Sequence, residues 1–174
     1  MRLAKFILAL MLAVAGFQTV STAQDNSPNH VHYKESPQAS QPSPTGQLAP
    51  RLQKLGVHIF PVTTNNKQAQ LFMNQGLSLS YAFNHAEAGR AYREAARLDP
   101  NLAMAFWGEA LALGPNINAP MDPSNEPIAL EVIQKAVALK AKASPRERAL
   151  IDALVNRYSG RAEDRRARDV AYAD

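Results

Sequence analysis

The chain has 174 residues, no cysteine and a formal net charge of +4. Without cysteine it has no disulfide, no thiolate-held metal or c-type haem and no lipid attached at a cysteine, so its stability must come from packing. Residues 1–23 hold two of the cations and no acid, so the rest of the chain carries only +2. The arginine-rich run 161–168 is interleaved with Glu163 and Asp164, a pattern typical of a solvated helix face rather than a nucleic-acid site.

Residues 1–23 have the parts of a cleavable export signal. A positively charged start precedes an uncharged apolar run over residues 6–16, and Ser21 and Ala23 place small residues before a cut ahead of Gln24. The run is shorter than the roughly 20 residues that cross a bilayer core. We therefore predict a periplasmic or secreted mature chain with no transmembrane segment. An uncleaved N-terminal anchor is the alternative.

Residues 24–50 have the composition of a linker. Prolines stand among Ser, Gln and Asn with hardly any large apolar side chain, at Pro28, Pro37, Pro42, Pro44 and Pro50. Such a segment buries too little surface to offset its ordering entropy, so we predict a disordered tether. His30 and His32 form an H-x-H pair there, which we interpret as incidental because a metal site needs several preorganised ligands.

From residue 51 the pattern becomes helical and rich in alanine. After a short apolar lead-in broken by Pro61, apolar and small residues recur at three- and four-residue intervals over 69–80 and 88–98. Asn65 with Gln68, and Asn84 with Glu87, are capping patterns that predict where these two helices begin.

Four further helices follow. A third, over 103–113, ends at Gly114-Pro115, and a loop leads to a fourth over 128–139. Ser144, Pro145 and Glu147 combine a serine cap, a first-turn proline and a third-position glutamate, which predicts the start of a fifth helix. A sixth begins near Ala162. Because no segment alternates with period two, we predict an all-α fold for residues 51–174.

Two of these helices match the tetratricopeptide repeat position by position. Large, small and aromatic residues stand where that repeat has them, and Phe72 lies 34 residues before Phe106, which is the repeat's period. The matching positions are Phe72, Gly76, Leu79, Ala88, Tyr92, Ala95 and the closing Pro100. The chain therefore resembles tetratricopeptide repeat proteins, which implies helix hairpins stacked into a right-handed solenoid. Gly76 is expected to pack against the helix that bears Ala88, and Phe106 beneath the preceding hairpin.

The chain also resembles one particular group of tetratricopeptide proteins, and it departs from the repeat pattern in one loop. The segments F-N-H-A-E-A, L-D-P-N-L-A-M-A-F-W-G and G-P-N-I-N-A-P-M are similar to a group of exported bacterial tetratricopeptide proteins about three times as long. Because solenoids need a terminal cap, we expect this chain to be the N-terminal part of a longer array. The loop over 114–121 replaces a tight turn. It is interpreted either as a functional loop or as a connector whose asparagines satisfy their own backbone.

The sequence offers little for catalysis. It contains no phosphate-binding glycine loop, no G-x-S-x-G and no H-E-x-x-H pattern, and we predict no catalytic residue, metal ligand or cofactor. Trp107 and the methionines at 73 and 104 fall on core positions by their helical spacing. His58 and His85 are interpreted as lead-in and turn residues.

The predicted function is protein or peptide binding outside the cytoplasm, in an envelope complex. The resemblance implies that each hairpin's first helix lines a concave groove, whose partner-binding candidates are Asn74, Gln75, Ser78, Tyr81, Asn84, Glu109 and Asn116. One alternative is an enzyme that depends on a metal or small ligand, with a site near His58, His85 and the Asn116 loop. A second alternative is a passive spacer in an assembly.

Overall fold

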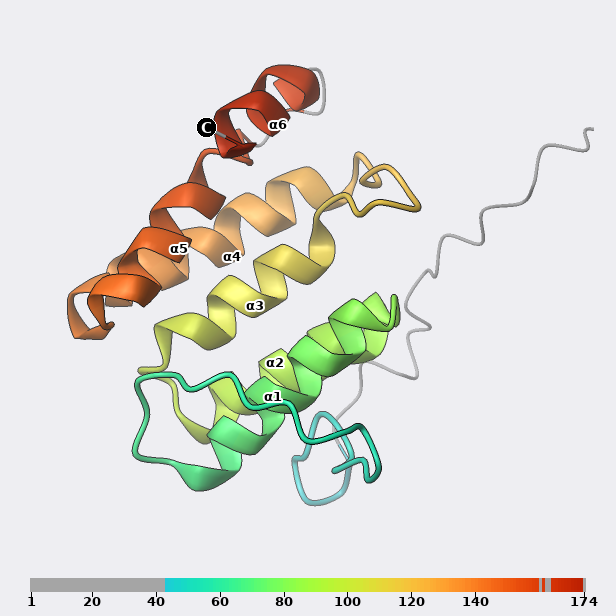
Figure 1. Cartoon of the computed structure of the whole chain (residues 1–174), viewed down its shortest axis with the longest axis vertical. Helices are drawn as coiled ribbons and strands as arrows, with labels where there is room; N and C mark the ends of the chain where they lie inside the picture. The colour runs from blue at the N-terminus through green and yellow to red at the C-terminus, as the bar shows by residue number, and fades with distance from the viewer. Residues whose placement is uncertain (1–42, 160, 162–163, 174) are drawn as a thin grey trace, which may run out of the picture. The chain divides into compact units, whose positions relative to one another are not determined.

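The computed structural model describes residues 43–159, 161 and 164–173, and it is all-α over these residues (Figure 1). The predicted export signal and most of the predicted linker lie outside the described residues. The helices are α1 (Lys67–Tyr81), α2 (His85–Leu98), α3 (Ala103–Leu113), α4 (Asn125–Leu139), the 3₁₀ turn η2 (Lys140–Lys142), α5 (Pro145–Val155) and α6 (Arg165–Ala173). Within the described ranges no strand forms, and the only β pairing is an isolated bridge between Asn116 and Ala119.

Side-chain caps fix where three of the helices begin. Asn84 Oδ1 accepts from the Glu87 amide at 3.4 Å, as predicted. Ser144 and Glu147 form the predicted capping box at the start of α5, with Pro145 in its first turn. The prediction for α1 was wrong by one residue: its cap is Asn66 rather than Asn65, and Asn66 Oδ1 accepts from the amides of Gln68 and Ala69.

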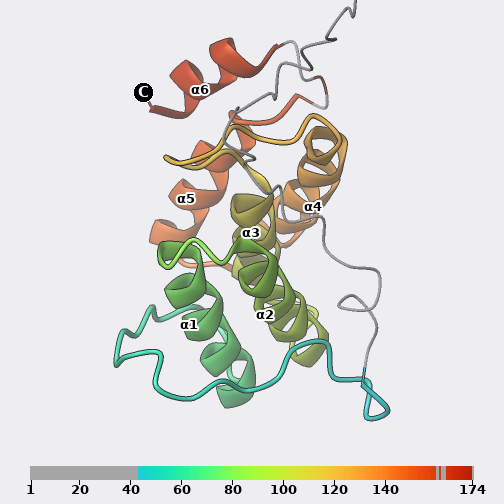
Figure 2. The same ribbon diagram turned by 90° about the vertical axis from the view of Figure 1, so that its right-hand side faces the viewer.

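Consecutive helices pack against one another in chain order, and the odd-numbered helices also meet. Contacts join α1 to α2, α2 to α3 and α3 to α4, and further contacts join α1 to α3 and α3 to α5. Figure 1 shows α3 between the α1–α2 pair and the α4–α5 pair, and Figure 2 shows the same order from the side. The first helices of successive hairpins therefore lie next to each other.

The centre of the array is built around Tyr92 of α2, which is fully buried. A Cβ added to Gly76 of α1 would come within 2.6 Å of the Tyr92 ring, and one added to Gly108 of α3 within 2.4 Å. The ring is thus held between two glycine backbones, which lets three helices approach closely. Its hydroxyl lies 3.3 Å from Ser80 Oγ, and burial raises the pKa of Tyr92 well above its ordinary value, against the opposing effect of that hydrogen bond.

The expected position of Gly76 is confirmed, because Tyr92 belongs to the same helix as Ala88. Phe106 packs only partly buried against the core, while the neighbouring Trp107 is 7% exposed. Trp107 Nε1 donates to the Leu150 carbonyl at 3.1 Å and so joins α3 to α5. The core interpretation of Trp107 is therefore confirmed.

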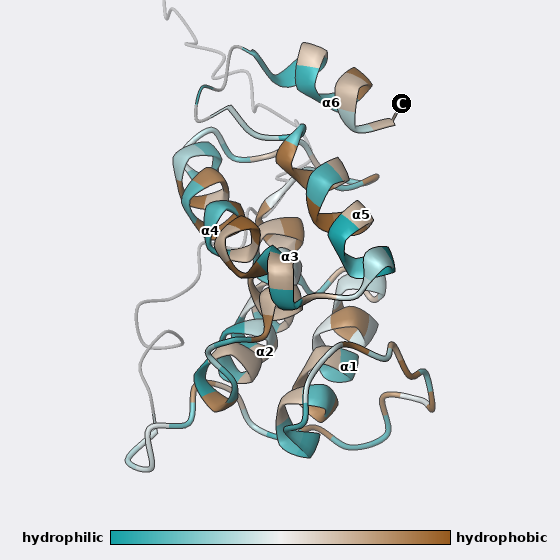
Figure 3. Cartoon of the chain, turned by 90° about the vertical axis from the view of Figure 1, so that its left-hand side faces the viewer, coloured by the Kyte–Doolittle hydropathy of each residue, from teal (hydrophilic) through white to brown (hydrophobic). Residues whose placement is uncertain are grey.

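Helix α3 is buried on nearly all sides. Half of its buried residues are alanine, and the others are Met104, Trp107 and Gly108. Figure 3 shows its ribbon in brown and pale colours, whereas α5 and α6 carry teal stretches. A helix that is apolar around its circumference belongs inside a fold. None of the described helices is long and apolar enough to cross a bilayer.

The glycine contacts predict the stability of three variants. Gly108→Ala should lower the free energy of unfolding by about 1–3 kcal/mol, because the new methyl must displace the Tyr92 ring. Gly76→Ala should act in the same direction. Urea unfolding followed by circular dichroism at 222 nm measures both.

Gly89→Ala in α2 is the matched control. Its added Cβ would meet only Arg93 Nη1, at an ordinary 3.6 Å. Alanine favours a helix over glycine by about 1 kcal/mol, so this variant should be as stable as the parent or more stable. Equal stability of Gly108→Ala and Gly89→Ala would contradict the proposed packing of Tyr92.

Candidate functional site

An extended segment without helix, residues 47–63, lies across the helices ahead of α1; we call it the strap. Figure 2 shows its blue-to-teal trace looping outward beside α1. The strap includes the last four residues of the predicted linker. Those residues, 47–50, pack on the helices, and Ala49 is 2% exposed. The ordered unit therefore begins before residue 51.

The first anchor of the strap lies on α1 and α2. Glu94 Oε2 accepts from the Leu48 amide at 2.9 Å. The buried Gln75 side chain bonds to the strap backbone on both sides of its amide group: Oε1 accepts from the Leu52 amide at 2.9 Å, and Nε2 donates to the Pro50 carbonyl at 2.9 Å. Two side chains thus satisfy three backbone groups of the strap.

The second anchor uses two more carboxamides of α1. Asn74 Oδ1 accepts from the Phe60 amide at 3.0 Å. Gln70 Nε2 donates to the Phe60 carbonyl at 2.8 Å, and Gln70 Oε1 accepts from the Val62 amide at 3.0 Å. Gln70 also donates to Asn74 at 2.9 Å, which fixes both groups. These hydrogen bonds involve only backbone groups of the strap, so they do not depend on the identity of its side chains.

Phe60 is the strap's principal side-chain contact at this anchor. Its ring stacks on Trp107 of α3 with a centroid distance of 6.2 Å and an interplanar angle of 19°. The guanidinium carbon of Arg146, in α5, lies 5.0 Å from the centroid of the Phe60 ring. We call this position, where Phe60 contacts both Trp107 and Arg146, the aromatic seat. With Gln70 and Asn74, it places groups from α1, α3 and α5 along one binding surface, which we call the groove.

Glu147 of α5 closes the end of the groove and is 3% exposed. Its Oε1 accepts from the Thr63 amide at 2.7 Å, and its Oε2 accepts from the Thr63 hydroxyl at 2.5 Å and the Ser144 amide at 2.7 Å. Burial by itself raises the pKa of Glu147, but these hydrogen bonds outweigh it and hold the pKa below 4.5. The pKa of Glu94 is lowered in the same way: burial opposes the shift, and bonds from Arg97 and Leu48 produce it.

The middle of the strap, residues 53–59, makes fewer contacts with the helices than the two anchors do. In the described part of the chain it makes no hydrogen bond to a helix, and only Leu55 packs against the core. Val57 is 95% exposed and Ile59 is 66% exposed. Lys54 and Gly56 have φ angles of 62° and 85°, so the backbone is left-handed at these two residues.

The partner-binding candidates divide into two sets. Asn74 and Gln75 both lie in the anchors and bind extended backbone, but the backbone belongs to the chain itself. Among the others, Tyr81 is 76% exposed at the end of α1, and Ser78 is half-buried one turn earlier. Asn84 is used as the α2 cap, and Glu109 pairs with Arg93 of α2 at 3.4 Å.

Asn116 serves its own loop. Its Oδ1 accepts from the amides of Asn118 and Ala119 at 2.8 and 3.0 Å. This bonding agrees with the connector interpretation of the loop, although Ile117 beside it is 89% exposed.

The two histidines of the alternative enzyme site are placed differently. His58 is exposed in the middle of the strap. His85 begins α2, lies edge-on to Phe83 at 6.2 Å between ring centroids, and has both ring nitrogens buried without a hydrogen-bond partner in the described structure. Burial lowers the pKa of His85. Among the described residues no three His, Cys, Asp or Glu side chains gather where they could hold a metal ion.

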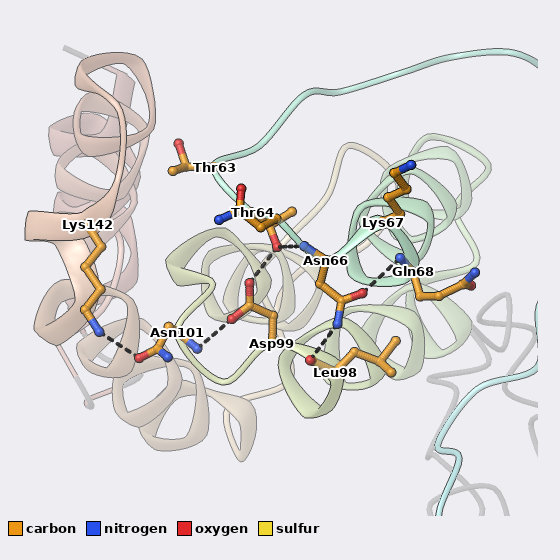
Figure 4. A pocket seen from close by; sticks show the side chains of 10 residues that line it. Thr63, Thr64, Asn66, Lys67, Gln68, Leu98, Asp99, Asn101 and Lys142 are labelled. Atoms are coloured by element: carbon orange, nitrogen blue, oxygen red, sulfur yellow. Dashed lines mark hydrogen bonds between the residues drawn. The ribbon is translucent and has the colours of Figure 1, made fainter.

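A polar hollow of about 820 Å³ lies at the start of α1 (Figure 4). Its polar side chains bind one another: Thr64 Oγ1 donates to Asp99 at 2.5 Å, and Asn66 Nδ2 donates to the Leu98 carbonyl at 2.8 Å. Lys142 Nζ donates to Asn101 Oδ1 at 2.7 Å. We interpret the hollow as a junction that ties α1 to the α2–α3 turn and η2.

No family model, curated protein or solved structure matches this chain.

Several groove residues were missing from the sequence-based candidates. Gln70 lies one turn before Asn74 on the same helix, so i, i+4 spacing was a signal for it. Glu94 and Glu147 gave no such signal, because their strap partners are 46 and 84 residues away.

Glu147 predicts a pH-dependent part of the stability. Because its folded pKa is lowered, ionised Glu147 stabilises the fold above pH 4.5, and this contribution disappears as the pH falls through the folded pKa. Glu147→Gln should lose about 1–3 kcal/mol of unfolding free energy at pH 7. It should also lose less stability than the parent as the pH is lowered from 7 through the folded pKa of Glu147. Urea midpoints across this range test both.

Glu131→Gln serves as the control, because Glu131 is 71% exposed and pairs with the half-exposed Lys135 at 2.9 Å. Exposed pairs contribute at most about 1 kcal/mol, so this variant should follow the parent curve. If Glu147→Gln also follows the parent curve, Glu147 does not hold the strap as described.

Proposed function

We propose that the chain is a tetratricopeptide-type scaffold that binds a protein or peptide partner outside the cytoplasm. One observation carries this proposal: side chains of α1 hold extended backbone by main-chain hydrogen bonds, through Gln70, Asn74 and Gln75. A surface that satisfies the amides and carbonyls of one extended segment has the chemistry to bind another.

The helix order supports the repeat interpretation. Stacked hairpins bring each first helix next to the first helix of the neighbouring hairpin, and contacts between α1 and α3 and between α3 and α5 have this form. The placement of Tyr92 between Gly76 and Gly108 supplies the close packing that such stacking needs. The location outside the cytoplasm rests on the export-signal pattern of residues 1–23.

The surface near the end of α1 offers a contact that the strap does not use. Tyr81 is 76% exposed and Phe83, in the turn after it, is 51% exposed. Tyrosine is enriched among the residues that dominate binding energy, because it combines a large apolar area with a hydroxyl. We therefore place part of the partner contact at Tyr81.

A pull-down from the envelope fraction, followed by binding measurements on the captured partner, tests the proposal. Tyr81→Ala should weaken that partner's binding about tenfold, which corresponds to about 1.4 kcal/mol and is typical of an interface residue that matters. Lys135→Ala on α4, where the side chain is half exposed, should leave the affinity unchanged. Failure to capture any partner, by the parent chain and under cross-linking alike, would favour the passive-spacer alternative.

A further inference from the structure

We propose that the strap is an exchangeable internal ligand: it occupies the groove in the free protein, and a partner segment displaces it. This inference rests on the proposed function and adds the chemistry of the ligand. The occupant that fits is an extended segment of another protein carrying an aromatic residue followed by proline, as Phe60 and Pro61 do in the strap.

The strap is held at its two anchors and is loose between them. Leu52, Phe60 and Val62 pack partly buried against the core at the anchors, whereas Val57 and Ile59 in the middle are 95% and 66% exposed. Its hydrogen bonds at the second anchor go from carboxamides to its backbone, where any residue supplies the same groups except that proline lacks the amide. The aromatic seat supplies the selective contact.

The arrangement also permits exchange without unfolding the helices. The two anchors are separated by residues 53–59, which make no hydrogen bond to a helix within the described structure. The second anchor can therefore detach while the first stays bound. At the second anchor, Phe60 and Val62 are only partly buried against the core, whereas Tyr92 is fully buried between Gly76 and Gly108.

Because the strap is covalently joined to its binding site, a competing ligand must overcome the strap's high local concentration. A segment joined to its site by a short flexible connection acts at an effective concentration in the millimolar range. An external peptide with the same contacts binds only to the fraction of molecules whose groove is open, so its apparent affinity is reduced by that fraction. Weakening the strap without touching the groove should therefore strengthen external binding.

The test uses a fluorescein-labelled peptide with the sequence of residues 57–64 and measures its binding to the full chain by fluorescence polarisation. Phe60→Ala removes the strap's own ring from the aromatic seat. Val62→Pro independently removes the amide that donates to Gln70. Each variant should bind the peptide at least about tenfold more tightly than the parent does. Val57→Ala, which changes a side chain 95% exposed, is the control and should bind as the parent does.

Two further variants address the groove and the peptide. A peptide whose phenylalanine is replaced by alanine should not bind Phe60→Ala measurably, and Gln70→Ala added to Phe60→Ala should abolish the gain. Circular dichroism confirms that each variant keeps its helices. If both strap variants stay helical and bind the peptide no better than the parent, the strap is a fixed part of the fold and the inference is overturned.

That failure would leave the proposed function standing, because the Tyr81 measurement on the captured partner is separate. Size-exclusion chromatography of the parent protein tests the other possible occupant of the groove, which is the strap of a second copy. A dimer that Phe60→Ala abolishes would show that the groove takes the strap of a second copy, which would overturn the assignment to a different protein.

Discussion

The fold depends on the close approach of three helices around one tyrosine. Tyr92 of α2 is fully buried between Gly76 of α1 and Gly108 of α3, and neither glycine leaves space for even a methyl group. Large and small residues thus alternate across the interface, which brings α1 and α3 near enough to share one surface. Because α3 also contacts α5, that surface continues across three helices.

The groove follows from this closeness. Gln70 and Asn74 of α1, Trp107 of α3 and Glu147 of α5 all contact a strap segment of four residues, 60–63. Were α1 and α3 separated by the width of an additional side chain, the carboxamides and the aromatic seat would not contact the same short segment. Packing in the core and recognition at the surface are therefore consequences of the same pair of glycines.

The polar side chains that hold the strap are already hydrogen-bonded to it, which explains why the site does not resemble an open cleft. A buried glutamine or glutamate without partners destabilises a fold. Here the strap supplies partners to Gln75, Glu94 and Glu147, in addition to the bonds that Glu94 accepts from Arg97 and Glu147 from Ser144. The strap and these side chains therefore stabilise each other. A ligand that displaced the strap, as we propose, would have to offer the same backbone groups and would therefore be an extended segment.

Much of the local structure was predictable, because it depends on neighbours within one or two helical turns. The caps at Asn84 and Ser144, the end of α3 at Gly114 and the core position of Trp107 each follow from periodicity or capping chemistry. The α1 cap was misplaced by one residue because Asn65 and Asn66 both have the capping side chain, and only the backbone conformation distinguishes them. Asn74 and Gln75 were singled out as groove residues, but nothing in their spacing indicated that the chain itself fills the groove.

The sequence by itself determined that the described chain is helical, where most helices begin and end, and which small and large residues can nest. Only the tertiary structure decided that residues 47–50 belong to the ordered unit, and that Phe60 contacts both Trp107 and Arg146. The physical reason is the range of the interactions. Caps and helical faces are set by residues three or four positions apart, whereas the strap is held by groups as far as 84 positions along the chain, and such pairings leave no period in the sequence.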